Sequence, residues 1–324
     1  MLPKLFCMLL ITTFKIFLFQ NSTTTTTTST SSTCGLSIKS RNLTYTIVTD
    51  DNNGTQTGYP GGYRAFQSDS CPGYDWSSQT TPNTALQIFK LVKLALQPKL
   101  SMNKTYVGIK TETGATVSPS VKGSIGIAVN GVSLYGNADA TSLDAFINEG
   151  ATFDTCGGHP APNGGDYHYH ASPAQGCAFN DTTGQHSPVF GFMFDGIPIY
   201  GELGDNGIAP TNLDECGGHV DVSNPFYHYH LPKNKAFPYL VTCFKGCIFG
   251  KNGNGLTSVT LATCNLNTTQ YNYSSINTPN YVTSYTPSAA TTTTTNSTNS
   301  TNKSGGSSLS FSALFLVIMS LFFY

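Results

Sequence analysis

The run Tyr167-His168-Tyr169-His170 is repeated as Tyr227-His228-Tyr229-His230, and the segments around these two runs match each other. A Cys-Gly-Gly-His run begins eleven residues before each of them, at Cys156 and at Cys216. The offset between the two copies is therefore 60 residues throughout. Six of the seven histidines lie in these matching segments, and the exception is His186. Such constant spacing indicates an internal tandem duplication.

A second pair of matching segments lies before the Tyr-His-Tyr-His runs. Residues 126–136 (Gly-Ile-Ala-Val-Asn-Gly-Val-Ser-Leu-Tyr-Gly) match residues 191–201 (Gly-Phe-Met-Phe-Asp-Gly-Ile-Pro-Ile-Tyr-Gly) at an offset of 65. The repeats extend over about 124–180 and 189–247. In each of them two apolar stretches flank an Asn-Gly or Asp-Gly pair, which tolerates the positive φ angles of a type I′ turn. We therefore predict a β-hairpin in each repeat.

Nearly every apolar stretch is short and bounded by Gly, Pro, Asn or Asp, which is typical of β-rich domains. Further strands are predicted within residues 36–48, 106–110 and 237–243, and one short helical turn at 143–148. Residues 84–96 fit an apolar period of either 2 or 3.6, so both a strand and a helix remain open there. The predicted fold class is mainly β: an internally duplicated, β-rich domain with a pseudo-twofold repeat, short strands and hairpins, and little helix.

The two ends of the chain have features of a secreted, surface-attached protein. Residues 1–21 contain an early lysine and apolar stretches and are predicted to be a signal peptide. Residues 309–324 are apolar and follow small and polar residues, which predicts a GPI-attachment signal, with a short C-terminal membrane anchor as the alternative. The Ser/Thr-rich residues 22–33 and the Thr/Asn/Ser-rich stalk 287–308 cannot bury a core. The folded domain is therefore expected at residues 34–286.

Charged residues are scarce in this chain. They make up 10% of the sequence, and the net charge is −1. This balance gives no reason to expect nucleic-acid binding or electrostatic attachment to a membrane. Solubility is instead expected from N-linked sugar, because Asn-x-Ser/Thr sequons are frequent. The sequons predicted to be glycosylated in the folded domain begin at Asn42, Asn53, Asn103, Asn180, Asn267 and Asn272.

The cysteine count also fits a secreted protein. There are nine cysteines, and Cys7 would be removed with the signal peptide. The remaining even number predicts up to four disulfides. The two repeats are expected to hold equivalent internal bridges, and the other four cysteines would form the other two. The predicted bridges are Cys34–Cys71, Cys156–Cys177, Cys216–Cys243 and Cys247–Cys264.

The histidines of the two repeats form a candidate metal-binding set. In a strand, His168 and His170 share one face and the tyrosines share the other. The second run has the same pattern, and the histidine after each Gly-Gly pair would complete each set from a loop. The predicted ligands are His159, His168, His170, His219, His228 and His230. Neutral imidazole suits a transition metal such as copper or zinc, and the lack of a nearby Glu cluster argues against calcium or magnesium.

Other interpretations of these side chains remain open. The histidines could be structural, with ring nitrogens bonded to buried backbone or to tyrosine hydroxyls. His186 is predicted to be an ordinary surface or loop residue. Asp195 is predicted to be a turn residue, as Asn130 is, with metal binding or a role as a base as the alternative. Asp154 and Asp214 are expected to cap loops or to accept hydrogen bonds from the Gly-Gly backbone.

Together these motifs resemble the family known as YHYH-domain proteins. The resemblance rests on Asp-x-Cys-Gly-Gly-His, on Asp-Gly-Ile-Pro-Ile-Tyr-Gly and on both Tyr-His-Tyr-His runs, with residues 125–135 and 238–243 in addition. It covers roughly residues 80–250. The resemblance implies an extracellular domain and favours a strand at residues 84–96. It implies no known reaction and assigns no catalytic residue.

Three functions are compatible with these features. The first is a cell-surface glycoprotein whose duplicated domain binds a transition metal, either at one site shared by the repeats or at two similar sites. The second is an extracellular enzyme, a metal-dependent hydrolase or a copper oxidoreductase, which needs an open coordination position and a pocket. The third is a non-catalytic adhesion or coat protein with structural histidines. The sequence does not specify a protein or small-molecule ligand.

Overall fold

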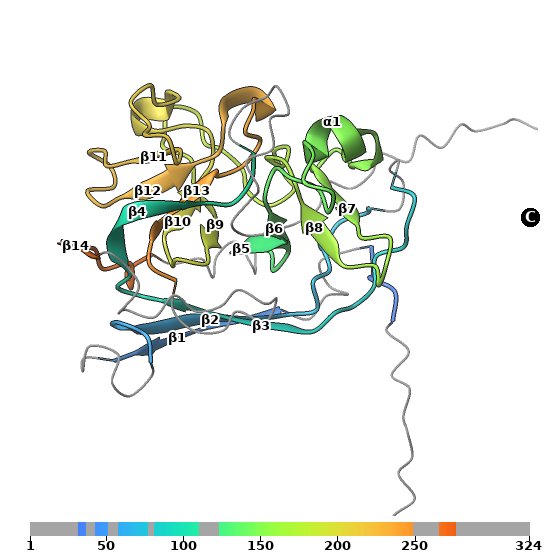
Figure 1. The fold of residues 1–324 in the computed structure, drawn as a ribbon, viewed down its shortest axis with the longest axis horizontal. Coiled ribbons are helices and arrows are strands. Elements are labelled where there is room, and N and C mark those ends of the chain that lie inside the picture. The colour runs from blue at the N-terminus through green and yellow to red at the C-terminus, as the bar shows by residue number, and fades with distance from the viewer. Residues whose placement is uncertain are drawn as a thin grey trace, which may run out of the picture. The chain divides into compact units, whose positions relative to one another are not determined.

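The computed structural model describes residues 32–36, 43–50, 58–76, 81–109, 123–248 and 266–276. Within these residues the chain is mainly β, as the sequence predicted, and contains one short α-helix (Figure 1). The predicted signal peptide, the stalk, the C-terminal signal and the sequons at Asn42 and Asn53 lie outside the described residues. In the described part of the chain, no helix has the length and apolar character needed to cross a membrane.

The strands form three sheets. The first sheet, in the order β1-β2-β3, contains β1 (Leu43–Thr49), β2 (Gly62–Ser68) and β3 (Lys90–Ala95). The second, in the order β11-β12-β10-β9-β5-β6-β8-β7, contains β5 (Ser124–Ala128), β6 (Ser133–Tyr135), β7 (Gly158–Pro160), β8 (Tyr167–Tyr169), β9 (Val189–Met193), β10 (Pro198–Tyr200), β11 (Gly218–His219) and β12 (His228–His230). The third, in the order β13-β4-β14, contains β4 (Lys99–Tyr106), β13 (Cys243–Gly246) and β14 (Leu266–Gln270). The helices are α1 (Ala145–Glu149) and the 3-10 turns η2 (Gly150–Thr152), η3 (Asp205–Gly207) and η4 (Lys233–Lys235).

The eight-stranded sheet has the same strand arrangement in both directions from its centre. There, β5 and β9 pair antiparallel, with Ile127 opposite Phe192. Outward from β9 come β10, β12 and β11, and outward from β5 come β6, β8 and β7. On both sides the successive pairings are antiparallel, parallel and antiparallel. The two Tyr-His-Tyr-His strands, β8 and β12, are therefore separated by four other strands.

The two predicted hairpins are present, but their turns differ from the prediction. In the first, the Gly131 N–H donates to the Ala128 carbonyl and the Ala128 N–H donates to the Val132 carbonyl. The second hairpin has the same pattern around Gly196. In each loop only the glycine takes a positive φ, 82° and 85° respectively. Each connection is therefore a three-residue loop with a glycine bulge, because the Asn or Asp before the glycine keeps an ordinary φ and accepts a hydrogen bond through its side chain.

The first sheet covers one face of the eight-stranded sheet near its centre (Figure 1). The rings of Phe66 in β2 and Phe192 in β9 lie 6.0 Å apart between centroids. The buried guanidinium of Arg64 lies 4.1 Å from the Phe192 ring centroid. Arg64 also donates to the carbonyls of Tyr273 and Ile276, at 2.6 and 3.2 Å. This contact stabilises the packing of residues 271–276 against the core.

Two predicted strands were wrong in position. A strand was predicted at residues 106–110, but β4 ends at Tyr106 because the chain leaves the sheet and the Val107 N–H donates to the Thr242 carbonyl. A strand was predicted at residues 237–243, but only Cys243 belongs to β13. Pro238 lies in this segment and has no N–H to donate to a neighbouring strand. Residues 84–96 do form a strand, as the resemblance favoured, although only over β3.

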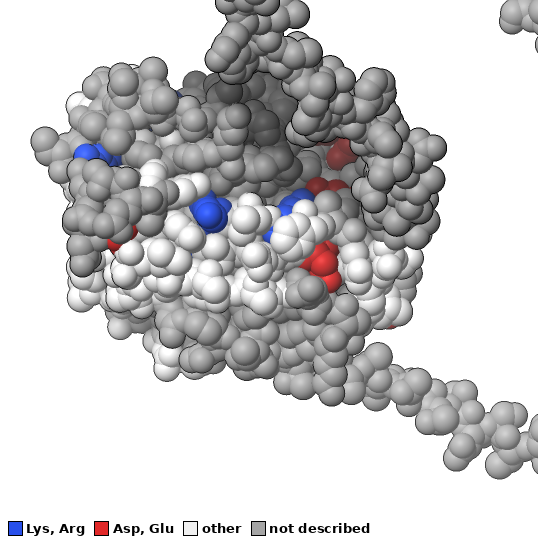
Figure 2. All heavy atoms as spheres, turned by 90° about the horizontal axis from the view of Figure 1, so that it is seen from below, with Lys and Arg blue, Asp and Glu red and all other residues white. Residues whose placement is uncertain are grey.

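The outer surface around the first sheet carries few charges. Figure 2 shows scattered basic and acidic groups on a mostly uncharged described surface, which matches the 10% charged composition. Among the predicted sequons, Asn103, Asn180 and Asn272 are exposed, and Asn267 lies in β14. The three exposed side chains are accessible to glycosylation.

Candidate metal centres

Each Cys-Gly-Gly-His segment is held by an aspartate and a disulfide. Asp154 and Asp214 each accept hydrogen bonds from the N–H groups of the first and third residues of the Cys-Gly-Gly run, at 2.9 and 3.2 Å in both repeats. This confirms the role predicted for both aspartates. The bridges Cys156–Cys177 and Cys216–Cys243 are formed, as the repeat predicted. The histidine that ends each segment is thereby fixed beside a Tyr-His-Tyr-His strand.

The remaining cysteines also agree with the prediction as far as the structure describes them. Cys34 is bonded to Cys71. Cys247 is disulfide-bonded as well, and its expected partner Cys264 lies outside the described residues. Disulfides persist in oxidising compartments, so these bridges are in keeping with an extracellular protein.

Alternation along β8 and β12 separates tyrosines from histidines, as the sequence predicted. The tyrosines face the core and are buried. Tyr169 accepts a hydrogen bond from the Asn130 amide at 2.9 Å, and Tyr229 donates to Asp195 at 2.7 Å. Asp195 also accepts from the Ile197 N–H and so acts as the predicted turn residue. Its carboxylate lies on the tyrosine side of the sheet, and the histidines lie on the other side.

The first histidine cluster consists of His159, His168 and His170. Strand β7 places His159 directly opposite His168 of β8. The Nε2 atoms of His168 and His170 are 3.1 Å apart, and one ligand atom from each of the three residues lies within 4.8 Å of the others. Donors bound tetrahedrally at about 2.0–2.1 Å from one ion are about 3.3 Å apart. The spacing of this cluster therefore suits a single ion.

A carboxylate borders the first cluster. The Oε2 atom of Glu149 is 3.7 Å from the Nε2 of His159 and 3.9 Å from the Nε2 of His170. Glu149 ends helix α1, which begins after Asp144, and the Asp144 side chain caps the first turn by accepting two backbone N–H groups. Burial and the nearby Asp139 raise the pKa of Glu149. The capped helix thus delivers a partly desolvated carboxylate to two of the three imidazoles, those of His159 and His170.

The second histidine cluster consists of His186, His219, His228, His230 and Asp221. Strand β11 places His219 opposite His228 of β12. The Nε2 atoms of His228 and His230 are 3.1 Å apart, and ligand atoms of these two residues, His186 and Asp221 lie within 4.8 Å of one another. The Oδ2 atom of Asp221 is 3.1 Å from the Nε2 of His186 and 3.6 Å from that of His219. Four imidazoles and one carboxylate therefore converge.

The structure corrects the prediction for His186 and adds two residues that the sequence did not indicate. His186 is not an ordinary loop residue, because its ring lies 4.9 Å from that of His230 between centroids. The positions that match His186 and Asp221 in the first repeat are Val121 and Ala161, so the repeat gave no signal for either residue. Glu149 was missed because it lies in a segment outside the matching motifs.

Every ring in the two clusters has its Nδ1 atom next to an oxygen. In the first cluster the oxygens belong to the Thr152 hydroxyl and to the carbonyls of Asp166 and Gly136, at 2.7–2.8 Å. In the second they belong to the Asn212 side chain and to the carbonyls of Phe226, Gly201 and Ser187, at 2.8–2.9 Å. These oxygens accept a hydrogen bond from Nδ1–H, which fixes the tautomer and leaves a lone pair on Nε2.

The Nε2 lone pairs therefore face one another without a proton between them. Two such acceptors at 3.1 Å do not form a hydrogen bond with each other. Among the described residues, the Nε2 atoms of His186 and His219 and the Oδ2 atom of Asp221 are buried without a hydrogen-bond partner. Each such buried group costs roughly 1–3 kcal/mol. A bound cation would satisfy all of these atoms together.

Burial keeps the rings of His159 and of both Tyr-His-Tyr-His runs neutral near pH 7, because it lowers their pKa. It lowers the pKa of His159 and of His170 to about 4. In the second cluster burial lowers the pKa of His228 to about 4 and that of His230 to about 3. Protonation of the rings is therefore disfavoured. Neutral imidazole is the form that binds transition metals, so the clusters are ready to bind them at neutral pH.

The two clusters are separate sites. Five inter-strand steps lie between β8 and β12, which at about 4.8 Å each amount to about 24 Å along the sheet. A single ion shared by the repeats is therefore not what the fold forms. Of the two arrangements that the sequence left open, the geometry matches two sites, one in each repeat.

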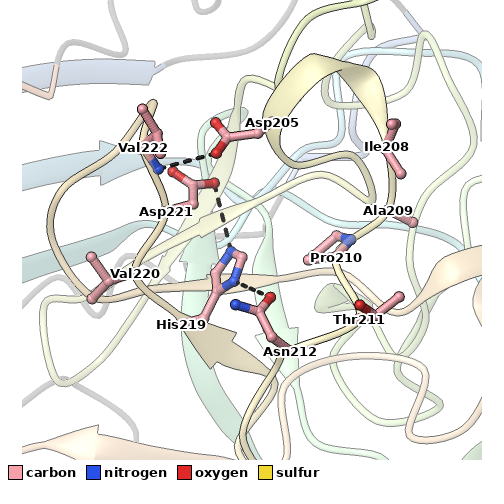
Figure 3. A pocket seen from close by; sticks show the side chains of 10 residues that line it. All are labelled: Asp205, Ile208, Ala209, Pro210, Thr211, Asn212, His219, Val220, Asp221 and Val222. Carbon is pink, nitrogen blue, oxygen red and sulfur yellow. Dashed lines mark hydrogen bonds and ion pairs between the residues drawn. The ribbon is translucent and has the colours of Figure 1, made fainter.

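A cavity adjoins each cluster. The cavity beside the first cluster has a volume of about 430 Å³ and is lined by all three histidines and by Glu149. A pocket of about 500 Å³ lies beside the second cluster and reaches His219 and Asp221. In Figure 3 the His219 ring extends between Asn212, which lies 2.8 Å from its Nδ1 atom, and Asp221, which lies 3.6 Å from its Nε2 atom.

Comparison with known families agrees with these motifs. The family model described as YHYH protein matches residues 104–212. This range contains the first histidine cluster and His186, and it ends before the second Cys-Gly-Gly-His run. Comparisons with curated proteins and with solved structures found no match. Residues 104–212 of this chain thus carry a YHYH domain.

Proposed function

We propose that this protein binds two transition-metal ions, one at each histidine cluster. The observation that carries the proposal is the orientation of the rings. Each Nδ1 lies against an oxygen, and the Nε2 atoms point toward a common centre in both clusters. Outer-shell acceptors of this kind orient metal-binding histidines and increase their basicity.

Copper and zinc are the metals that suit these donors best. Imidazole-rich sets with one carboxylate suit zinc, copper, iron or nickel, whereas calcium and magnesium prefer sites built from oxygen ligands. The purely structural interpretation of the histidines is weakened by the second cluster. Its buried Nε2 and carboxylate atoms lack the hydrogen bonds that structural histidines make.

Metal analysis of the full-length protein tests the proposal. We expect about two equivalents of copper or zinc per chain after reconstitution. The double variants His168→Ala/His170→Ala and His228→Ala/His230→Ala should each lose about one equivalent. The matched control is Asn103→Gln/Asn180→Gln, which changes two exposed side chains that belong to neither cluster and should keep both ions. Wild-type protein that binds less than about 0.1 equivalent of every transition metal would refute the proposal.

We also propose that the protein is a glycoprotein held at the cell surface by a GPI anchor. Support comes from the C-terminal sequence, from the disulfides and from the exposed sequons at Asn103 and Asn180. Phospholipase C specific for phosphatidylinositol should release the protein from intact cells. Removal of N-linked sugar should lower its apparent mass, and Asn103→Gln/Asn180→Gln should reduce that change. Protein that stays on cells after phospholipase treatment would favour a transmembrane tail.

A further inference from the structure

The two clusters offer different sets of metal-binding groups. The first has three imidazoles and Glu149, and the second has four imidazoles and Asp221. Val121 and Ala161 stand in the first repeat where His186 and Asp221 stand in the second. Neither valine nor alanine can bind a metal. By sequence, the first repeat therefore lacks counterparts of two donors that the second repeat has.

All three histidines of the first cluster are buried, and His186 and Asp221 of the second are partly buried, so the clusters differ in which members line a cavity. In the second cluster, the Nε2 atoms of His186 and His219 and the Oδ2 atom of Asp221 are buried from solvent. The adjoining pocket reaches only His219 and Asp221 among its five members. In the first cluster all three histidines line the cavity, and Ala161 forms part of the cavity wall. The open space in the first repeat thus lies at the position that the metal-facing aspartate takes in the second.

The cavity beside the first cluster has mainly apolar walls. Ala138, Ala140 and Pro162 line it, and the Tyr135 ring stacks on His168 at 4.0 Å between centroids. Asp139 also borders the cavity, but its carboxylate already accepts hydrogen bonds from the Thr141 and Leu143 N–H groups and from the Asn148 side chain. Its volume of about 430 Å³ is the size of a small-molecule site.

The charge balance indicates the class of ligand. The Asp139 carboxylate adds a negative charge to the cavity wall, but a divalent ion with three neutral imidazoles and one ionised Glu149 keeps one net positive charge at the metal itself. This charge favours a singly negative donor, and the apolar walls favour an apolar remainder of the molecule. Short-chain carboxylates combine both properties.

We propose that the first histidine cluster is a ligand-accepting metal centre and that the second is coordinatively closed. The ligand would be a small carboxylate with an apolar body, which enters through the cavity and binds the ion directly. This inference rests on the proposed function, because it requires an ion in each cluster. In this assignment the three imidazoles bind the ion and Glu149 stays beside it as an uncoordinated charge. Three protein ligands with an accessible position are typical of centres that bind an external ligand, and four or more protein ligands are typical of structural ones. An open position is also what a metal-dependent enzyme requires.

Electron paramagnetic resonance of the copper-loaded full-length protein tests this assignment, with azide and butyrate as probes. In His228→Ala/His230→Ala, which keeps the first cluster, azide should change the copper spectrum, and butyrate should compete with azide. In His168→Ala/His170→Ala, which keeps the second cluster, neither probe should have an effect. In wild-type protein azide should alter one of the two copper signals. Copper content is measured on the same samples, so the absence of bound copper would count against the proposed function and not against this assignment.

Two exchanges between the repeats give a test that keeps all the histidines. Ala161→Asp copies the second cluster into the first and should weaken azide binding about tenfold or more, with both ions retained. Asp221→Ala removes the carboxylate from the second cluster but leaves four imidazoles there, so its ion should stay insensitive to azide. The assignment is overturned if azide reaches the copper of His168→Ala/His170→Ala, or if the copper of His228→Ala/His230→Ala ignores it. Unchanged azide affinity in Ala161→Asp would also overturn it.

Discussion

Metal-depleted protein is expected to lose stability as the pH is lowered from about 7.5 to about 5. Histidine in the unfolded chain has a pKa near 6.5 and takes up a proton in this range. The buried rings of the two clusters do not, because burial lowers the pKa of four of them to about 3–4. The unfolded state therefore binds more protons than the folded state. Stability is fully present above the unfolded pKa of 6.5 and is lost progressively between 6.5 and about 4.

The expected magnitude follows from these pKa values. A ring with a pKa of about 4 in the folded state, against 6.5 in the unfolded state, loses about 2 kcal/mol by pH 5. For four such rings, His159, His170, His228 and His230, the sum is about 8 kcal/mol.

The buried Asp195 acts in the opposite direction. Burial raises its pKa from 3.8 to about 6, so the folded state takes up its proton first and regains about 1.4 kcal/mol by pH 5. The net loss from these five groups is then about 6–7 kcal/mol, which is comparable to the total stability of a typical domain, about 5–15 kcal/mol.

Urea unfolding at several pH values measures this loss. Trp76 is the only tryptophan in the chain and is 5% exposed, so its fluorescence reports on the core. Asp195→Asn should deepen the loss at pH 5 by about 1.4 kcal/mol, because the opposing group is removed. His228→Ala/His230→Ala should reduce the loss by about 4 kcal/mol, because two rings no longer contribute. If the unfolding free energy of the metal-free protein stays within about 1 kcal/mol between pH 7.5 and 5, the reasoning is refuted.

Three further predictions concern the fold around the clusters. Arg64→Ala should lower the free energy of unfolding by about 3 kcal/mol or more, because two buried carbonyls lose their donor and a cavity forms. Arg64→Met should lower it less. Equal urea midpoints for the two variants would contradict this. Gly196→Ala should lower the melting temperature more than Gly184→Ala. Both glycines have a positive φ, so both substitutions strain the backbone. A Cβ at Gly196 would also lie 2.7 Å from a backbone oxygen, whereas a Cβ at Gly184 would meet open space. Cys156→Ser/Cys177→Ser should lower the free energy of unfolding in urea by about 3 kcal/mol. It should also weaken metal binding at the first cluster alone. Equal weakening at both clusters would show that this bridge does not act locally.

The sequence predicted those parts of the site that depend on local pattern. Alternation along the Tyr-His-Tyr-His runs is enough to put the two histidines of each run on one face, and the Cys-Gly-Gly-His spacing brings in His159 and His219. The equivalent bridges and the hairpins follow from the repeat in the same way.

The parts that the sequence did not predict depend on contacts between distant segments. Glu149 reaches its cluster from a capped helix, and His186 and Asp221 reach theirs from positions that have no counterpart in the first repeat. The separation of the two clusters depends on strand order, because β10, β9, β5 and β6 come between β12 and β8. A short motif contains no information about which strands will pair beside it. The turn type also depended on backbone angles that Asn-Gly and Asp-Gly allow but do not require.

The antiparallel pairing of β5 with β9 has a consequence for how the two centres can diverge. Ile127 meets Phe192 at the middle of the sheet, and each is the counterpart of the other in its own half. In a polypeptide with only one repeat, the strand that corresponds to β5 or β9 would lie at the edge of the sheet. Two such molecules could pair through this strand in the same register, as in an isologous homodimer. In such a homodimer every substitution appears twice, so both centres must stay alike. Covalent linkage of the halves removes that constraint, and one centre can acquire a histidine and an aspartate while the other keeps an alanine and an open space.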